Sequence, residues 1–86
     1  MNAAAASSYV VTSPFVGVFQ RRPAPDSAPF VEPGSVVAEG QTVCVVEAMK
    51  LLNEIEAEQA GVVEQILVED LAPVEFGQPL MRVRAS

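Results

Sequence analysis

The chain has 86 residues, of which 50% are apolar, and this is enough for one small domain with its own core. A net charge of −6 argues against nucleic acid and against an anionic membrane surface as partners, because both attract basic proteins. Histidine is absent and Cys44 is the only cysteine, so the commonest general base is missing and an internal disulfide is excluded; we expect neither a catalytic residue nor a metal site.

The chain begins with an Ala/Ser-rich segment, residues 1–8, that has no cationic flank and no long apolar stretch. A secretory signal has both, so we expect these residues to form a flexible tail or the remnant of a linker. The longest aliphatic run, residues 43–46, is too short to cross a bilayer. We therefore expect one domain over residues 9–86, in the cytosol or an organelle matrix.

Short strands are predicted along the rest of the chain. Valine is the commonest apolar residue, and its branched side chain favours strands. Seven prolines and five glycines cut the chain into pieces too short for ordinary helices. Ile55 and Ala57 alternate with Glu54 and Glu56, as in a half-buried strand. The sequence therefore predicts a small all-β sandwich or barrel, with strands over residues 9–12, 17–20, 42–47, 52–58, 62–68 and 80–84.

The two halves of the chain resemble each other. Residues 31–41 match residues 68–78 at an offset of 37, and residues 17–19 match residues 61–63 at an offset of 44. The two offsets agree if the first half carries about seven extra residues between Phe19 and Val31. The polar, proline-rich segment 21–29 lies there, so it is predicted to be a stiff loop that protrudes from the domain.

The repeat also predicts where the single lysine lies. The positions that correspond to Lys50 are 87, just past the C-terminus, and 6, in the N-terminal segment. If a pseudo-two-fold axis relates the two halves, both chain ends lie at the pole opposite Lys50. A domain tethered at one end would then present this lysine at the other.

A tight turn is predicted at residues 48–51, between the strands on either side. This turn lacks the Asn-Gly or Gly-Gly pair that hairpins favour. Met49 or Lys50 at its tip would need a positive φ, which is costly for a residue with a Cβ. The mismatch suggests that the turn serves something other than folding, with the amine of Lys50 held outward and Met49 exposed.

The segment Glu47-Ala48-Met49-Lys50 resembles the biotin attachment site of biotinyl domains. The similarity extends from about Val11 to Val83, through residues 13–17, 36–41 and 73–76. One departure is Leu51, where methionine is frequent, but leucine is apolar and similar in size. The inserted loop resembles the thumb of the biotin carboxyl carrier proteins of multi-subunit acetyl-CoA carboxylase, bacterial or plastid in type; its residues are Arg22, Pro23, Ala24, Pro25 and Asp26.

This resemblance implies a flattened barrel of two four-stranded antiparallel sheets with pseudo-two-fold symmetry. It implies that Lys50 carries biotin in amide linkage, attached by a biotin–protein ligase. A biotin carboxylase would carboxylate the biotin with ATP and bicarbonate, and a carboxyltransferase would pass the carboxyl group to acetyl-CoA, the first step of fatty acid synthesis. The chain would be a non-catalytic carrier in the bacterial cytoplasm or the plastid stroma, with Met49 helping to distinguish biotin from lipoyl recognition.

Other functions remain open at this stage. Lipoyl domains resemble the same fold but typically show Asp-Lys-Ala at the turn, whereas Lys50 lies between Met49 and Leu51. An unmodified structural domain, as in adaptor proteins of export systems, would usually lack the attachment motif. An independent enzyme is disfavoured because nothing pairs a nucleophile with a base.

The remaining polar and small residues have simpler explanations. Cys44, in a valine strand, is expected to be a small buried hydrophobe, and Asp26 to be a turn-former. Arg21 and Arg22 are either solubilising charges or contacts to a partner or to the loop's own backbone. Backbone geometry best explains four of the glycines, namely Gly17, Gly40, Gly61 and Gly77.

Overall fold

The computed structural model describes residues 7–86, and all its regular elements are strands. The short, valine-rich runs between turn residues form these strands, as their β-branched side chains favour. The strands in chain order are β1 (Ser8–Thr12), β2 (Gly17–Gln20), β3 (Val36–Val37), β4 (Thr42–Ala48), β5 (Leu51–Glu56), β6 (Gly61–Ile66), β7 (Pro73–Val74) and β8 (Pro79–Ala85).

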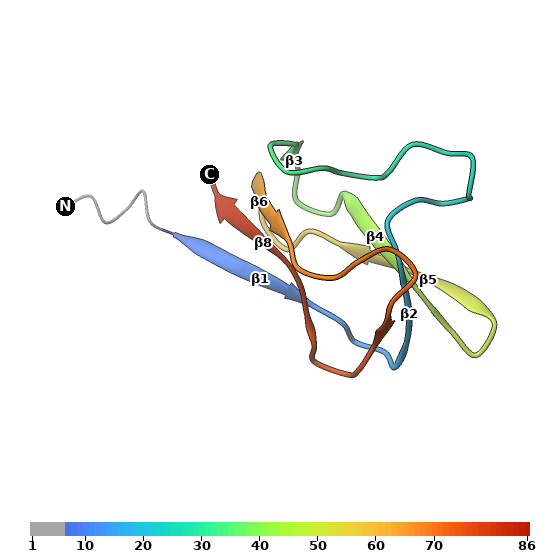
Figure 1. Ribbon diagram of the computed structural model, residues 1–86. Coiled ribbons are helices and arrows are strands. Elements are labelled where there is room, and N and C mark those ends of the chain that lie inside the picture. Colours follow the sequence, from blue (N-terminus) through green and yellow to red (C-terminus); the bar gives the residue numbers. More distant parts are fainter. Residues whose placement is uncertain (1–6) are drawn as a thin grey trace.

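The strands form two four-stranded sheets, one in the order β1-β8-β6-β3 and the other in the order β5-β4-β2-β7 (Figure 1). Every strand pair is antiparallel. The predicted fold class, an all-β flattened barrel of two four-stranded sheets, is confirmed. No helix of the length and apolar character that a membrane span requires occurs in residues 7–86.

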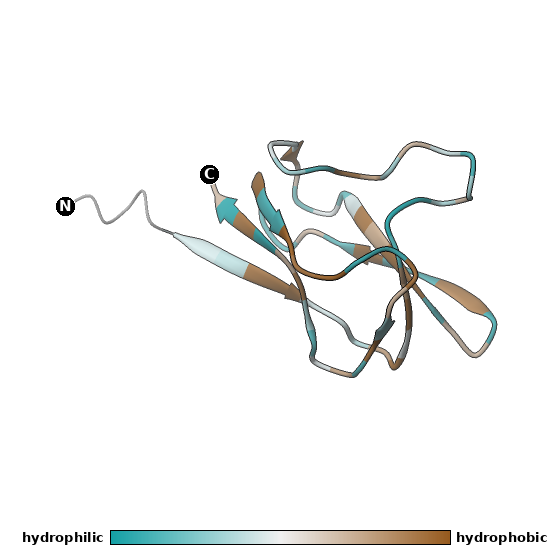
Figure 2. Ribbon diagram, in the orientation of Figure 1, coloured by the Kyte–Doolittle hydropathy of each residue, from teal (hydrophilic) through white to brown (hydrophobic). Residues whose placement is uncertain are grey.

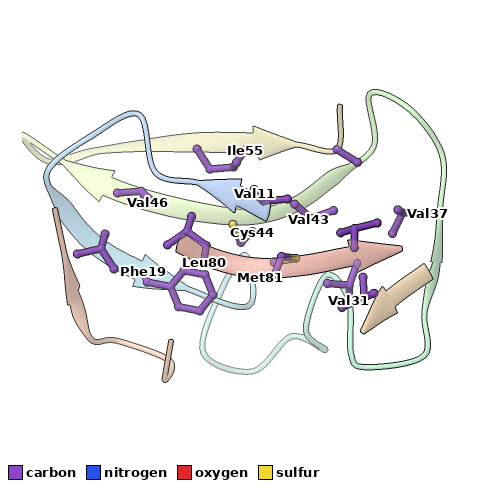
Figure 3. Packing of buried hydrophobic residues seen from close by; sticks show 14 residues of the cluster. Val11, Phe19, Val31, Val37, Val43, Cys44, Val46, Ile55, Leu80 and Met81 are labelled. Atoms are coloured by element: carbon purple, nitrogen blue, oxygen red, sulfur yellow. The ribbon is translucent and has the colours of Figure 1, made fainter. Parts of the chain in front are cut away.

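The core fills the space between the two sheets (Figure 3). Phe19, Leu80 and Met81 are its largest fully buried side chains, and valines fill most of the remaining volume. Full burial of a side chain of this size contributes about 1.5–3 kcal/mol. Cys44 lies among them with no exposed surface, so its expected role as a small hydrophobe is confirmed. Figure 2 shows how hydrophobic and hydrophilic residues are distributed along the strands and loops.

Strand ends differ from the prediction by up to two residues. β5 ends at Glu56 and β6 at Ile66, whereas the apolar pattern continues to Ala57 and Val68. The pattern misleads because Ala57 and Val68 still pack against the core after the backbone has left the ladder. The two-residue strands β3 and β7 were not among the predicted runs, because a strand of this length has no alternation to detect.

The internal repeat is confirmed by equivalent backbone hydrogen bonds in the two halves. Phe19 N donates to Ala72 O at 2.9 Å, and its counterpart Val63 N donates to Ser35 O at 2.9 Å. A Cβ on Gly17 would lie 2.1 Å from the carbonyl oxygen of Glu47. A Cβ on the equivalent residue, Gly61, would lie 2.2 Å from the carbonyl oxygen of Arg84. Both glycines therefore allow the backbones of two strands to approach closely. These pairs follow the offsets of 37 and 44.

Within the described residues, the start of β1 and the end of β8 lie at one end of the molecule and the β4–β5 turn lies at the other (Figure 1). Ala85 N donates to Ser7 O at 2.9 Å, which joins the end of β8 to the start of β1. The Tyr9 hydroxyl donates to Gln59 O at 2.7 Å and fixes β1 to the β5–β6 connection at the same end. The predicted tail, residues 1–8, falls mostly outside the described residues; β1 itself begins at Ser8.

Candidate functional site

The candidate site is the two-residue turn between β4 and β5. Ala48 and Leu51 form the last pair of the ladder, so Met49 and Lys50 alone make the turn. Their φ angles are 54° and 66°, both in the left-handed region. Two-residue hairpins favour positive φ at both turn positions because this matches the twist of the strands. The positive φ predicted from the sequence is therefore confirmed.

Both turn side chains point away from the barrel. Met49 is 93% exposed and Lys50 is also exposed. No hydrogen bond or ion pair formed by the described part of the chain involves Lys50. Leu51 and Leu52, at the start of β5, are exposed as well, and Figure 2 shows this hydrophobic stretch beside the turn. The lysine amine is thus accessible and sits on an apolar rim.

Polar contacts behind the turn hold the hairpin in place. Asn53 Nδ2 lies 3.2 Å from both Val46 O and Leu51 O and donates to each. Gln20 Nε2 donates to Glu47 Oε1 at 3.0 Å, so the carboxylate of Glu47 is turned toward β2 rather than toward the lysine. The structure therefore brings Glu47, Ala48, Met49 and Lys50 together on one hairpin end, with only the last two fully at the tip.

The inserted segment, residues 21–29, forms a loop outside both sheets (Figure 1). Ser27 N donates to Ala24 O at 3.0 Å, which closes a turn with Pro25 and Asp26 at its centre, so Asp26 is a turn residue as expected. Arg22 Nη1 donates to Ser27 O at 3.3 Å. Of the roles left open for the arginines, contact with the loop's own backbone is the one observed for Arg22.

An open cleft of about 350 Å³ separates the insertion from the barrel. Arg22 and the segment 23–25 form one wall, and Asp70 and Leu71 form the other. No hydrogen bond or ion pair within residues 7–86 links the insertion to the β4–β5 turn, so the structure does not join the two sequence-predicted sites directly.

Three lining residues of this cleft, Gln20, Asp70 and Leu71, were not among the sequence candidates. A signal existed in the repeat. Asp70 and Leu71 stand opposite Pro33 and Gly34 at the offset of 37, so the two halves differ there. A carboxylate and a leucine in place of a Pro-Gly turn indicate a role beyond the turn itself.

The single thiol lies outside the site. Burial among valines disfavours the charged thiolate and raises the pKa of Cys44 to about 12. Such a thiol is a poor nucleophile, since the thiolate is the reactive form. Among the residues described, no three His, Cys, Asp or Glu side chains are placed to hold a metal ion.

Comparison with known sequences assigns the chain to a family and identifies its relatives. A biotin carboxyl carrier protein of acetyl-CoA carboxylase from Nostoc sp. is 58% identical over 74 residues, which are 86% of this chain and 41% of the relative. The protein of the same name from Pseudomonas aeruginosa is 55% identical over 86% of this chain and 47% of its own. A chloroplastic one from Arabidopsis thaliana is 52% identical over 79% of this chain and 27% of its own. The chain thus spans less than half the length of these relatives.

Solved structures agree on the fold. The urea carboxylase of Kluyveromyces lactis contains a region that matches 90% of this chain at 26% identity with a TM-score of 0.74, and the match covers 6% of that enzyme. A single-chain, multi-domain long-chain acyl-CoA carboxylase matches 93% of this chain at 20% identity with a TM-score of 0.79, over 7% of its length. Residues 9–83 match the biotin/lipoyl family, described as "Biotin-requiring enzyme". This chain belongs to that family.

Proposed function

We propose that this chain is the biotin carboxyl carrier domain of an acetyl-CoA carboxylase, with biotin joined in amide linkage to Nζ of Lys50. The observation that carries the proposal is the exposed, unengaged lysine at a two-residue turn of positive φ, in a chain that matches the biotin/lipoyl family around it. The names of the relatives, which are biotin carboxyl carrier proteins of acetyl-CoA carboxylase, support the choice of cofactor and enzyme.

The residues of the turn fit a covalently attached group. Lys50 is the only lysine of the chain, and it extends from a hairpin whose base is held by Asn53. Amide formation removes one positive charge, so the net charge of −6 becomes −7. No salt bridge is lost, since none of the described carboxylates pairs with this amine. The apolar rim of Met49 and Leu51 suits an arm made mostly of methylene groups.

The chain's own role is to present Lys50 to partner enzymes and to carry the attached biotin between them. When bound, the ureido ring of biotin accepts a carboxyl group at one enzyme site and releases it at another. The barrel holds the β4–β5 turn, which contains Lys50, at the end opposite the start of β1 and the end of β8. A tether at the other end therefore leaves the lysine free to enter partner sites, and tethering raises its local concentration at each of them.

Three partners follow from this function: a biotin–protein ligase, a biotin carboxylase and a carboxyltransferase. A lysine amine attacks only in its neutral form, and the described residues place no base beside Lys50, so the ligase must supply one. Glu47, Ala48 and Met49 flank the amine and would be recognised by the ligase. Because the relatives are bacterial and chloroplastic, we place the protein in the bacterial cytoplasm or the plastid stroma.

The inserted loop is the proposed thumb of this carrier. It lies outside both sheets and contributes no residue to the buried core, so its contribution concerns partners rather than folding. We assign Arg22, Pro23, Ala24, Pro25 and Asp26 to the thumb, which would engage the enzymes during carboxyl transfer.

Incubation with a biotin–protein ligase, biotin and ATP tests the attachment. The wild-type chain should gain the mass of one biotin and react with avidin. The Lys50→Arg variant, which keeps the positive charge and the turn, should gain nothing. No mass gain in the wild type, or an equal gain in the variant, would contradict the proposal. A mass gain of one lipoyl group with a lipoate ligase, in the absence of biotin attachment, would favour the lipoyl alternative.

A further inference from the structure

Arg21 and Arg22, the first two residues of the insertion, both contact one acidic residue of the barrel, Asp70. Its Oδ1 accepts a hydrogen bond from Arg21 N at 2.8 Å, and its Oδ2 lies 3.6 Å from Arg22 Nε. Of the hydrogen bonds and ion pairs formed within residues 7–86, the Arg22–Asp70 pair is the only one that joins residues 22–29 to the rest of the domain. Arg21 Nη2 also donates to Val31 O at 3.3 Å, but this contact lies at the base of the loop, so Asp70 provides the polar contact beyond it.

The other half of the molecule shows that the turn does not need a carboxylate at the position of Asp70. Asp70 lies in a turn closed by Ala72 N, which donates to Glu69 O at 3.1 Å. The equivalent turn in the first half is closed by Ser35 N and Glu32 O at 2.9 Å, with Pro33 at the position of Asp70. Because a proline side chain offers no acceptor, the carboxylate must be explained by something outside the turn.

The position of this turn supplies the explanation. Leu71 N donates to Phe19 O at 2.7 Å, just before the chain leaves β2 for the insertion. The equivalent bond in the other half joins Gly34 N to Val63 O, where the chain continues along β6 without an insertion. Leu71 has a φ of 69°, whereas Gly34 has 96°. Both turns begin with a glutamate, but only the turn that faces the insertion carries a second carboxylate, Asp70, and has a leucine in the left-handed region.

The ion pair also spans the cleft. Arg22 lies on the wall formed by the insertion, Asp70 lies on the opposite wall, and Gln20 lines the cleft as well. A charged contact between the two walls sets their separation. The two side chains are 34% and 31% exposed while Arg22 Nε itself is buried, so salt screens this ion pair less than it screens a fully exposed one.

We propose that Asp70 is a positioning residue of the carrier, which fixes the insertion in one orientation against the barrel through Arg21 N–H and the Arg22 guanidinium. The inference rests on the proposed function, because that function gives the fixed orientation its purpose. A partner enzyme would meet the thumb already in the conformation that the enzyme binds. A loop that visits this conformation only part of the time binds more weakly in proportion.

Backbone ¹⁵N relaxation of Asp70→Ala, Asp70→Asn and Glu69→Gln tests the physical part. The order parameters of residues 22, 24 and 26–28 should fall from about 0.85 toward 0.6 or below in Asp70→Ala. Asp70→Asn keeps an acceptor for Arg21 N–H, so its order parameters for these residues should lie between those of the wild type and those of Asp70→Ala. Glu69→Gln removes the same charge one residue away, from an exposed side chain, and should match the wild type. Unchanged order parameters in Asp70→Ala would overturn the proposal. So would an equal fall of the order parameters in β4 and β8, because the substitution would then loosen the whole domain.

Carboxylation of the biotinylated chains by a bacterial biotin carboxylase tests the purpose. Asp70→Ala should take up biotin as completely as the wild type, with a KM for the carrier raised about tenfold and kcat little changed. A KM equal to that of the wild type and of Glu69→Gln would overturn the proposal. If the wild type itself takes up no biotin, the proposed function fails, and the order parameters alone decide whether Asp70 fixes the loop.

Discussion

Three of the non-glycine residues between positions 7 and 86 have a positive φ: Met49, Lys50 and Leu71. A left-handed conformation costs a residue with a Cβ about 1–2 kcal/mol, so three such residues are a considerable cost for a domain of this size. Two of them present the lysine and the third borders the insertion. The backbone strain therefore lies at the two places to which we assign a function.

Cys44 shows how burial of one side chain links stability to pH. The folded chain holds the pKa of this thiol at about 12, above the ordinary value of 9.0, because the core disfavours the thiolate. The unfolded chain loses this proton at lower pH than the folded chain does. Stability from this group is therefore fully present below pH 9 and is lost as the pH rises toward 12.

The free energy of unfolding of the wild type should fall relative to that of Cys44→Ala between pH 9 and pH 12, by up to about 4 kcal/mol. Urea denaturation of both proteins at a series of pH values measures the difference, and the variant serves as the reference for every other titrating group. Parallel curves for the two proteins would show that the buried thiol does not have the assigned pKa.

For single residues, the sequence predicts conformation and burial where neighbours in the chain determine them. The positive φ at the turn follows from two strands joined by two residues, and the burial of Cys44 follows from its valine neighbours. Asp70 could not be predicted in this way. Its partners Arg21 and Arg22 are 49 and 48 positions away in the chain, and only the folded topology brings β2 beside the Asp70 turn.

At the scale of elements, the insertion is separate from the structure that supports the fold. Residues 21–29 supply none of the core side chains, and the two stems of the loop are joined at its base by Phe30 N, which donates to Arg21 O at 2.8 Å. The sequence predicts an insertion here because a repeat with two unequal offsets requires extra residues at one place, between Phe19 and Val31. The strand ends were less certain, since side chains can pack on the core beyond the end of a ladder.

Replacement of residues 22–28 by a short Asn-Gly turn should leave the barrel folded. We expect the melting temperature to change by a few °C at most, because the replaced residues supply no core side chain. Biotin attachment to Lys50 should stay complete, because the β4–β5 turn is unchanged. The rate of carboxyl transfer should fall, since the proposed thumb is missing. Differential scanning calorimetry measures the first effect and a carboxylation assay the second.

A control for this deletion is Pro23→Ala with Pro25→Ala, which keeps the length of the loop and its arginine. It should fold as stably as the wild type and transfer carboxyl groups faster than the deletion variant. Cooperative unfolding at a much lower temperature in the deletion variant would mean that the insertion belongs to the core after all.

At the scale of the whole molecule, the two-fold repeat explains why the β4–β5 turn lies at the pole opposite the start of β1 and the end of β8. The β4–β5 turn occupies a position whose counterpart in the other half falls just past the C-terminus. One pole therefore presents a closed hairpin, and the other presents the start of β1 and the end of β8. This arrangement suits a carrier that is tethered at one end and meets its partners at the other.

The carrier claim is tested most directly by following the carboxyl group itself. The ligase-treated chain, incubated with a biotin carboxylase, ATP and radiolabelled bicarbonate and then separated from small molecules, should retain up to about one label per chain. That label should leave the protein when a carboxyltransferase and acetyl-CoA are added, and Lys50→Arg should retain none. A wild-type chain that holds no label, or a variant that holds as much, would contradict the account.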